Sequence, residues 1–242
     1  MSHPMPRPMQ GLRAAVTGGT SGLGLALVEA LHERGAAVAF VARDAARVVA
    51  LARRLPGTHG IEGDVAAKSQ AHTLALRINA ALGGLDLLIH NASSLGPVPL
   101  APLADTECED FERALATNVL GPFRLTKALL GALGAAAREG RPALVVNIGS
   151  DAALNAYAGW GAYGASKAAL VQMSRIWDEE LKPHGIRMLA LDPGDMDTPL
   201  HALAVPDADP ATLKRPADAA REIVLAVEAH WRTSSARSQA FA

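Results

Sequence analysis

A glycine-rich turn near the N-terminus constrains the fold more than any other feature of the chain. The turn consists of Thr17-Gly18-Gly19-Thr20-Ser21-Gly22-Leu23-Gly24. It follows an apolar run at 12–17 and opens a segment, 22–34, whose apolar residues recur at helical spacing. In a strand, turn and helix unit, glycines let a backbone approach a pyrophosphate at the helix N-terminus. The spacing Gly-x-x-x-Gly-x-Gly differs from the better-known Gly-x-Gly-x-x-Gly, so a simple tight turn remains the alternative.

The rest of the chain continues this alternation of short apolar runs and longer amphipathic segments. A second apolar run at 37–42 completes a βαβ unit, and further strands are expected near 58–62, 85–89, 143–148 and 186–191. Helices are expected near 44–54, 67–81, 105–137, 160–181 and 216–230. Continuously apolar strands are typical of a parallel sheet that is covered on both faces. The pattern therefore predicts a doubly wound α/β fold of six to seven strands between two helix layers.

Composition favours one globular domain. The chain has 242 residues, half of them apolar, a net charge of −1 and a pI near 6.7, so neither nucleic acid nor an anionic membrane is expected as a partner. Residues 1–10 carry no continuous apolar run and are interpreted as a loose tail before a domain at 11–242, not as a signal peptide or anchor. Cys108, the only cysteine, excludes an internal disulfide and a cysteine-based zinc site, and fits a reducing cytoplasm. No histidines show metal-ligand spacing, and no metal is expected.

A tyrosine and a lysine one helical turn apart form the second informative pattern. Residues 165–176 favour a helix, so Tyr163 and Lys167, at i and i+4, are expected on one face, with Ser150 thirteen residues before the tyrosine. A nearby ammonium favours phenolate and would lower the tyrosine pKa from its reference value near 10. The tyrosine could then act as an acid or base near neutral pH. The same spacing also occurs on solvated helix faces, and this alternative stays open on the pair alone.

Several further motifs occur in the order and spacing of one enzyme family. They are Thr17-Gly18-x-x-x-Gly22-x-Gly24, Asp64-Val65, His90-Asn91-Ala92-Ser93, Asn118-Val119-Leu120-Gly121, the set Ser150, Tyr163 and Lys167, and Pro193-Gly194-Asp195-Met196-Asp197-Thr198. Through these motifs the chain resembles the compact, single-domain short-chain dehydrogenase/reductases over about residues 11–230. The resemblance implies a Rossmann-type, NAD(P)-dependent oxidoreductase that acts on the carbonyl or secondary alcohol of a small molecule.

The resemblance also implies roles for individual residues. Tyr163 would be the general acid or base, Ser150 would orient the substrate oxygen, Lys167 would lower the tyrosine pKa and bind the ribose, and Asn118 would hold a water in a proton relay. Asp64 would contact adenine, although it could be only a turn residue, and His90 would support its loop. The implied cofactor contacts are Gly18, Thr20, Ser21, Gly22, Leu23, Gly24, Arg43, Asp64, Val65, Asn91, Ala92, Pro193, Gly194, Met196 and Thr198, together with Tyr163 and Lys167.

The end of the second expected strand bears on the choice of cofactor. A carboxylate there binds the ribose hydroxyls of NAD, whereas an arginine accommodates the 2′-phosphate of NADP. Ala42 occupies the usual acidic position and Arg43 follows it, which favours NADP(H). Asp44 is the competing ribose ligand, but a helix cap is the role we expect for it. Ser21 stands where NADP-using relatives often carry a second basic residue.

The sequence says less about substrate and assembly. The segment 199–214 is expected to form a short lid, and Asn155, Tyr157 and Trp160 are candidate pocket walls. Two departures from the family pattern are Ser93, where glycine is usual, and the C-terminus, where a seventh strand could survive only near 238–241. We therefore expect a homodimer through the helices at 105–137 and 160–181, and a tetramer is in doubt. A dinucleotide-binding sensor without turnover is the alternative function.

Overall fold

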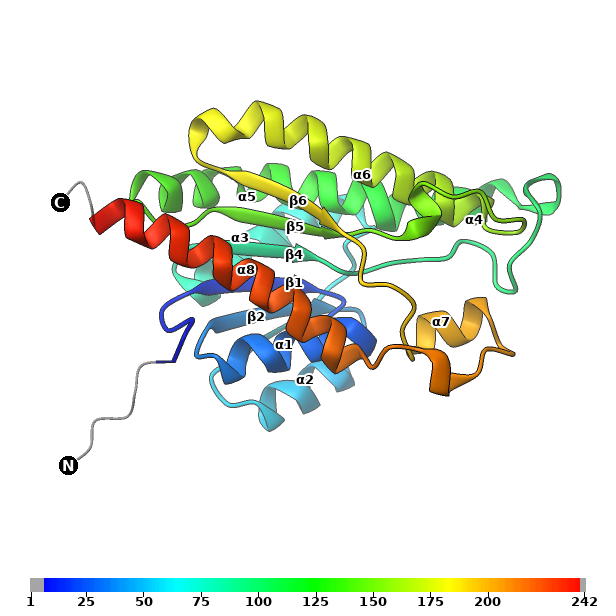
Figure 1. The fold of residues 1–242 in the computed structure, drawn as a ribbon, viewed down its shortest axis with the longest axis horizontal. Coiled ribbons are helices and arrows are strands. Elements are labelled where there is room, and N and C mark those ends of the chain that lie inside the picture. Colours follow the sequence, from blue (N-terminus) through cyan, green and yellow to red (C-terminus); the bar gives the residue numbers. More distant parts are fainter. Residues whose placement is uncertain (1–6, 240–242) are drawn as a thin grey trace.

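The fold is known from a computed structural model, of which residues 7–239 are described, with side chains to residue 230. Its described residues form one sheet of six parallel strands in the order β3-β2-β1-β4-β5-β6 (Figure 1). The predicted doubly wound fold is confirmed. The strands are β1 (Arg13–Thr17), β2 (Ala37–Ala42), β3 (His59–Glu62), β4 (Leu87–His90), β5 (Leu144–Ile148) and β6 (Arg187–Leu191).

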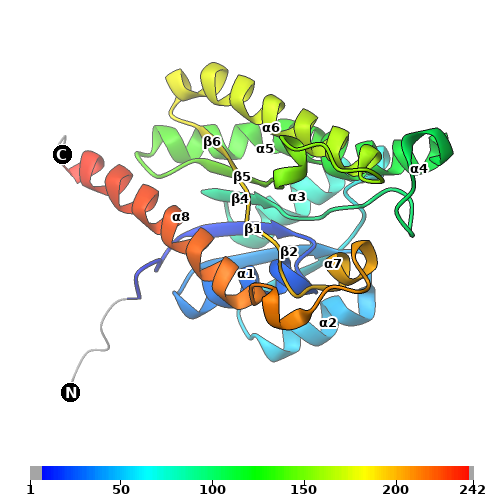
Figure 2. The ribbon, with the colours of Figure 1, turned by 45° about the vertical axis from the view of Figure 1, so that its right-hand side comes forward.

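Helices cover both faces of the sheet because the strand side chains alternate between two apolar layers. Ala14 and Val16 of β1 belong to one buried cluster, whereas Ala15 between them belongs to the other. The first cluster is completed by α1 (Gly22–Glu33), α2 (Ala45–Arg54) and α8 (Pro216–Gln239). The second is completed by α3 (Ala71–Leu82), α5 (Gly121–Arg138) and α6 (Gly161–Leu181), and Figure 2 shows the two layers on opposite sides of the sheet.

The sheet changes winding direction between β1 and β4. These strands pair in parallel, with Ala15 opposite Leu88, although β2 and β3 lie between them in the chain. Ligands of doubly wound sheets bind in the crevice at the carboxyl ends of the strands at such a point. Two short helices, α4 (Cys108–Leu115) and α7 (Pro199–Ala204), lie beyond these strand ends (Figure 1).

One long expected helix, at 105–137, is interrupted. The chain forms α4, then the π-helical turn η3 (Ala116–Leu120), and then α5. Asn118 lies buried within this turn. Single π-turns inside helices often mark functional positions, so the interruption draws attention to Asn118.

Two expectations about the chain ends are wrong in part. Residues 238–239 belong to α8, so they form no seventh strand, and the rest of that expected strand, 240–241, lies outside the described residues. The proposed loose tail at 1–10 is wrong for its last residues. Met9 is fully buried in the core beside α1 and α8, and its backbone N–H donates to the Arg34 carbonyl at 3.0 Å. Nothing is described of residues 1–6.

Candidate active site

The glycine-rich turn is closely packed at the carboxyl end of β1. Gly18 and Gly22 adopt positive φ angles of 69° and 49°, a conformation that side chains disfavour. A Cβ atom on Gly24 would lie 2.1 Å from the Gly18 carbonyl oxygen, so no side chain fits there. Leu23, between these glycines, is buried against the core, while Thr20 is half-buried and Ser21 exposed at the start of α1. The turn thus presents backbone at a helix N-terminus.

Hydrogen bonds join this turn to the end of β4. The Thr17 hydroxyl accepts from the backbone N–H groups of Asn91 and Ala92, at 3.0 and 3.1 Å. The Asn91 side-chain amide in turn donates to the carbonyls of Thr17 and Gly18. The two strand ends at the change of winding are therefore locked together, and Asn91 and Ala92 lie beside the turn as the sequence predicts.

The segment after β6 closes over the same turn. A Cβ atom on Gly22 would lie 3.2 Å from the Thr198 side chain. Thr198 is the N-cap of α7, and its hydroxyl accepts from the His201 N–H at 3.2 Å. Pro193 is buried, Gly194 has a φ of 74°, and Met196 bridges to Lys214. The lid at 199–214 is short, consisting of α7 and one 3-10 turn (Pro210–Thr212).

The residues expected at the adenosine end lie after β2 and β3. Arg43 is exposed, and no carboxylate among the described residues pairs with it. Asp44 caps α2 by accepting from the Arg47 N–H at 3.0 Å, as predicted. The Asp64 carboxylate accepts from the Ala66 N–H at 2.9 Å, which is the turn role left open for it, and Val65 is buried.

Tyr163 and Lys167 share one buried face at the start of α6, as the i and i+4 spacing predicts. The Lys167 ammonium lies 5.4 Å from the centre of the Tyr163 ring and donates to the Ile148 carbonyl at 2.8 Å. Both residues are more than nine-tenths buried. The alternative of a solvated helix face is therefore excluded for this pair.

The pKa of Tyr163 is shifted in the direction opposite to the one expected from the sequence. Burial lowers the pKa of Lys167 to about 8, because it disfavours the charged amine, and the Asp192 carboxylate opposes this shift. Burial also raises the pKa of Tyr163, despite opposing hydrogen bonds from Ser150 and Ser93. The expected direction of the tyrosine pKa is thus wrong: burial raises it, and this favours the protonated phenol.

Two hydroxyl groups act on the Tyr163 phenol. They belong to Ser150, after β5, and Ser93, after β4, and both lower the pKa of the tyrosine. The Ser93 hydroxyl also lies 3.3 Å from the Asn118 side-chain oxygen. Ser150, Tyr163, Ser93 and Asn118 therefore lie in one group, with the buried Lys167 beside the tyrosine ring.

Two members of the network around Asn118 were not foreseen from the sequence. The Asn118 amide donates to the Ser166 hydroxyl and to the Ser94 carbonyl, and its oxygen accepts from the Ser94 N–H, each at 2.8 Å. The Ser166 hydroxyl in turn donates to the Tyr163 carbonyl at 2.7 Å. Ser94 and Ser166 adjoin recognised motifs, which is the only sequence signal that could have indicated them.

Apolar side chains bound the space beside Tyr163. A small cluster contains Leu95, Ala152 and Tyr163, with Leu100, Trp160, Leu200 and Ala204 packed against it. Trp160 meets the Tyr163 ring edge-on at 5.7 Å between centroids. Of the expected walls, Trp160 thus touches the tyrosine, while Tyr157 and Asn155 are exposed.

His90 supports the loop after β4 and takes no part in the chemistry that we propose for the site. It is buried with its ring 2.8 Å from the Thr126 hydroxyl, and burial lowers its pKa to about 3, so its imidazole is neutral.

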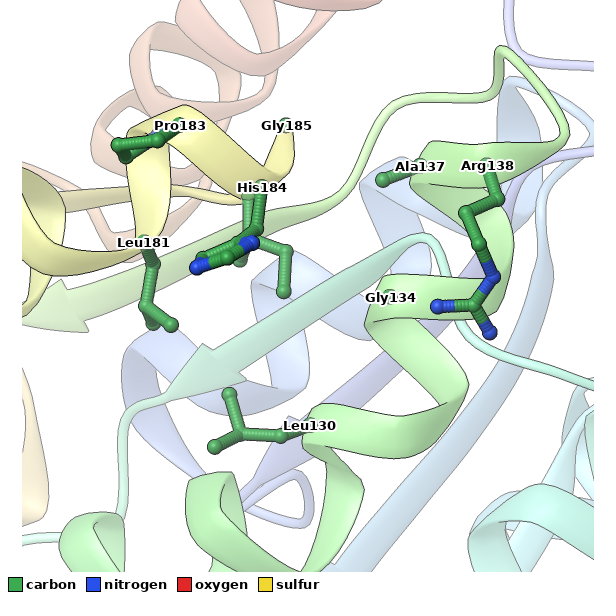
Figure 3. A pocket seen from close by; sticks show the side chains of 9 residues that line it. Leu130, Gly134, Ala137, Arg138, Leu181, Pro183, His184 and Gly185 are labelled. Atoms are coloured by element: carbon green, nitrogen blue, oxygen red, sulfur yellow. The ribbon is translucent and has the colours of Figure 1, made fainter.

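A groove lies apart from the candidate active site. Figure 3 shows it lined by Leu130, Arg138, Leu181 and His184, at the opposite end of the sheet, before β6 begins. Within residues 7–230, no group of side chains could hold a metal ion, and no helix of the described chain is long and apolar enough to cross a membrane.

Comparisons with known proteins agree on one family. The family model for short chain dehydrogenases matches residues 13–209. The L-fucose dehydrogenase of Mus musculus is 34% identical over 81% of this chain and 69% of its own length. A 3-ketoacyl-(acyl-carrier-protein) reductase of Brucella melitensis, solved with NADH, superposes with a TM-score of 0.83 at 26% identity, covering 89% and 90% of the two chains. A short chain dehydrogenase of Escherichia coli CFT073, solved with NADPH, gives 0.80 at 27% identity, covering 89% and 90%.

Proposed function

Because the chain belongs to the short-chain dehydrogenase/reductase family, we propose that it transfers a hydride between NADP(H) and the carbonyl or secondary alcohol of a small molecule, with Tyr163 as general acid or base. The observation that carries this proposal is the buried pair Tyr163 and Lys167, grouped with Ser150, Ser93 and Asn118. A protein that only binds a dinucleotide has no need of a buried phenol between two hydroxyls.

The backbone around the turn fits a dinucleotide. Gly18 and Gly24 leave no room for side chains, so a pyrophosphate would meet main-chain N–H groups at the start of α1. Thr198, in contact with Gly22, would lie over the nicotinamide half, and Asn91 and Ala92 would line the crevice between β1 and β4. Asp64 and Val65 would adjoin the adenine. When bound, the nicotinamide supplies or accepts the hydride.

The protonation states favour carbonyl reduction as the first direction to test. Burial keeps Tyr163 protonated, which is the form that a general acid needs to give a proton to a carbonyl oxygen. Ser150 would orient that oxygen, and Asn118 would hold the loop at 93–95 beside it. Lys167, with a pKa of about 8, would exchange its carbonyl contact for a cofactor ribose and restore the proton on Tyr163. Alcohol oxidation follows the same path in reverse.

Arg43 supports the choice of NADP(H). It follows β2, is exposed and is free of carboxylate partners among the described residues, as a ligand for a 2′-phosphate needs to be. We expect Arg43→Ala to weaken NADPH binding by about tenfold or more, since a hydrogen bond to a charged group contributes about 1.5–3 kcal/mol, and to leave NADH binding nearly unchanged. Arg47→Ala is the matched control, because Arg47 is engaged with Asp44. If Arg43→Ala lost affinity for NADPH and NADH equally, Arg43 would not be a ligand of the 2′-phosphate.

Turnover with a panel of small carbonyl compounds tests the proposed activity. Wild-type protein is expected to consume NADPH faster than NADH with at least one compound, and Tyr163→Phe is expected to lose this activity. Tight NADPH binding with no difference between wild type and variant across a broad panel would favour the sensor function instead.

We also propose a homodimer through α5 and α6. Exposed apolar side chains lie on these helices and on the adjoining turn η3: Leu120, Phe123 and Ile176. Phe123 stacks on Trp177 of α6 at 5.3 Å, so the two helices present one joined surface. A second copy of the same surface would remove these side chains from water.

A further inference from the structure

Two short elements, η4 (Asp151–Ala153) and α7, border the space beside Tyr163. Ala152 of η4 belongs to the same apolar cluster as Tyr163, and Leu200 of α7 packs against that cluster. A Cβ atom on Gly164 would lie 2.9 Å from the Ala152 carbonyl oxygen, so η4 lies directly against the start of α6. The polar side chains of η4 and α7 are therefore placed to meet a molecule that binds beside Tyr163.

Two hydroxyl groups hold the carboxylate of Asp151 at this border. Its Oδ1 atom accepts from the Ser150 hydroxyl at 3.2 Å, and its Oδ2 atom accepts from the Tyr157 hydroxyl at 2.7 Å. A carboxylate offers about four lone-pair sites and gives no proton, so about two sites stay open to another donor. No cation among the described side chains pairs with Asp151. Asp151 is therefore an acceptor that is fixed beside the serine expected to orient the substrate oxygen.

The lid helix α7 brings a second acceptor, His201, to the same space. With 3.6 residues to each helical turn, His201 lies on the face of α7 between Thr198, which lies against the glycine-rich turn, and Leu200 and Ala204, which pack against the Tyr163 cluster. Its Nδ1 atom is buried and has no hydrogen-bond partner among the described residues, whereas its Nε2 atom lies 3.9 Å from Asp195 Oδ1. The carboxylate favours a proton on Nε2, so the neutral ring presents a lone pair at Nδ1. Because buried polar atoms are hydrogen-bonded in native proteins, this lone pair indicates a donor on a bound molecule.

The loops around this space carry no cationic side chain to receive an anion. The segments after β4, β5 and β6, residues 91–106, 150–160 and 192–213, contain seven aspartates and neither lysine nor arginine. Lys214, directly after the last of these segments, pairs with Glu222 at 2.8 Å. Proteins hold carboxylate and phosphate groups with arginine, lysine and N–H donors. The loops therefore disfavour a substrate with a negative charge near its reacting carbon.

On the proposed function, we propose that the substrate is an uncharged carbonyl or alcohol with hydroxyl groups next to the reacting carbon, as in a hydroxyketone or a polyol, and that these hydroxyl groups donate to Asp151 and His201. In the reduction, the carbonyl carbon receives a hydride from the reduced nicotinamide and the carbonyl oxygen receives the Tyr163 proton, while the neighbouring hydroxyl groups are unchanged. Trp160 and Leu200 would cover the carbon side of the same molecule. Asp151 and His201 are thus specificity-determining residues.

Ketones with the same four-carbon chain and different substituents test this substrate class. NADPH oxidation would be measured with erythrulose, which carries hydroxyl groups on both sides of its carbonyl, with 2-butanone, which carries none, with the anion acetoacetate and with the cation of 1-amino-2-butanone. Wild-type protein is expected to give a kcat/KM for erythrulose at least about tenfold above that of each other ketone, because only erythrulose donates hydroxyl groups to both acceptors. A preference for any of the other three would overturn the proposal.

Asp151→Ala and His201→Phe test the two assigned residues. Each is expected to raise the KM for erythrulose about fivefold or more and to change kcat/KM for 2-butanone by less than about twofold, because only the hydroxylated ketone loses a hydrogen bond. Asp207→Asn removes an exposed carboxylate of the lid and is the matched control, which should keep the preference for erythrulose. If Asp151→Ala fails to fold by circular dichroism, Tyr157→Phe releases the Oδ2 atom instead and should weaken the preference. An unchanged preference in Asp151→Ala or in His201→Phe would overturn the proposal.

A binding measurement separates the substrate class from the proposed activity. In Tyr163→Phe protein with NADPH, an NMR titration gives the affinity for each ketone without need of turnover. Erythrulose is expected to bind at least about tenfold more tightly than 2-butanone, and adding Asp151→Ala is expected to remove most of this difference. A binding preference for erythrulose in a protein without reductase activity would refute only the proposed function. Turnover of all four ketones without a preference would refute only the substrate class.

Discussion

Asp86 is a single residue that joins three parts of the chain at the amino ends of the strands. Its carboxylate has no exposed surface and accepts from the guanidinium groups of Arg13 and Arg141, with contacts as short as 2.7 and 2.6 Å. Burial alone would raise the pKa of this carboxyl, but the hydrogen bonds from both arginines outweigh burial and hold the pKa below its usual 3.8. Asp86 therefore contributes to stability as an ionised group.

Replacement of Asp86 by asparagine is expected to lower the free energy of unfolding by about 2 to 3 kcal/mol at neutral pH, because two partly buried guanidinium groups lose their charged hydrogen bonds to Asp86. A carboxyl with a depressed pKa in the folded state stabilises above its unfolded-state pKa, and this contribution is lost as the pH falls. The difference between wild type and Asp86→Asn in urea unfolding should therefore shrink below about pH 4.

Asp218→Asn is the control for this prediction, because Asp218 pairs with Arg215 and Arg221 on the surface and should matter little. If the difference in unfolding free energy between wild type and Asp86→Asn stayed constant from neutral to acidic pH, Asp86 would not stabilise the fold as an ionised group.

At the residue scale, the sequence was sufficient to predict that Tyr163 and Lys167 meet, but not the direction of the tyrosine pKa. The i and i+4 spacing placed Tyr163 and Lys167 on one face correctly. The direction of the tyrosine pKa was wrong, because it depends on how deeply loops from elsewhere in the chain bury the ring. The contacts of Ser94 and Ser166 with Asn118 were likewise beyond prediction, since they depend on the relative placement of three elements.

At the scale of elements, the π-turn η3 positions the loop after β4. Asn118 makes side-chain hydrogen bonds to Ser94 and Ser166 from within this turn, and it is almost fully buried. We expect Asn118→Ala to reduce stability by about 2 to 3 kcal/mol, since the partly buried N–H and carbonyl of Ser94 lose their bonds to Asn118. Hydrogen exchange should also become faster at the Ser94 amide.

The exchange measurement distinguishes this role from a general loss of stability. Asn79→Ala, on the exposed side of α3, serves as the control. It should change neither the free energy of unfolding nor the exchange rate of the Ser94 amide appreciably. Unchanged protection of the Ser94 amide in Asn118→Ala would show that η3 does not hold the loop.

All six strands were predicted, and their apolar runs are clearest in β2, β4 and β5. The break at η3 was missed, although Pro122, which lies in the first turn of α5 and lacks a backbone N–H, is a signal for an interruption there. The C-terminal helix also exceeded its expected length. Its packing along α1 in the first core cluster is a tertiary contact that local sequence does not contain.

At the scale of the molecule, the joined surface of α5 and α6 carries a prediction about assembly. Ile176→Glu would place a carboxylate within the proposed dimer surface, and analytical ultracentrifugation should show the wild-type dimer shifted toward monomer. Leu76→Glu is the matched control, because Leu76 is an exposed apolar residue of α3, away from that surface. A dimer unaffected by Ile176→Glu would place the interface elsewhere.

The separation of cofactor binding from turnover at Tyr163 tests the central claim most directly. NADPH affinity and the rate of NADPH oxidation with the best carbonyl substrate would be measured for wild type and Tyr163→Phe. We expect Tyr163→Phe to bind NADPH within a few-fold of wild type but to turn over at least about a hundredfold more slowly, since it lacks the proton donor. A variant that keeps wild-type turnover would contradict the account.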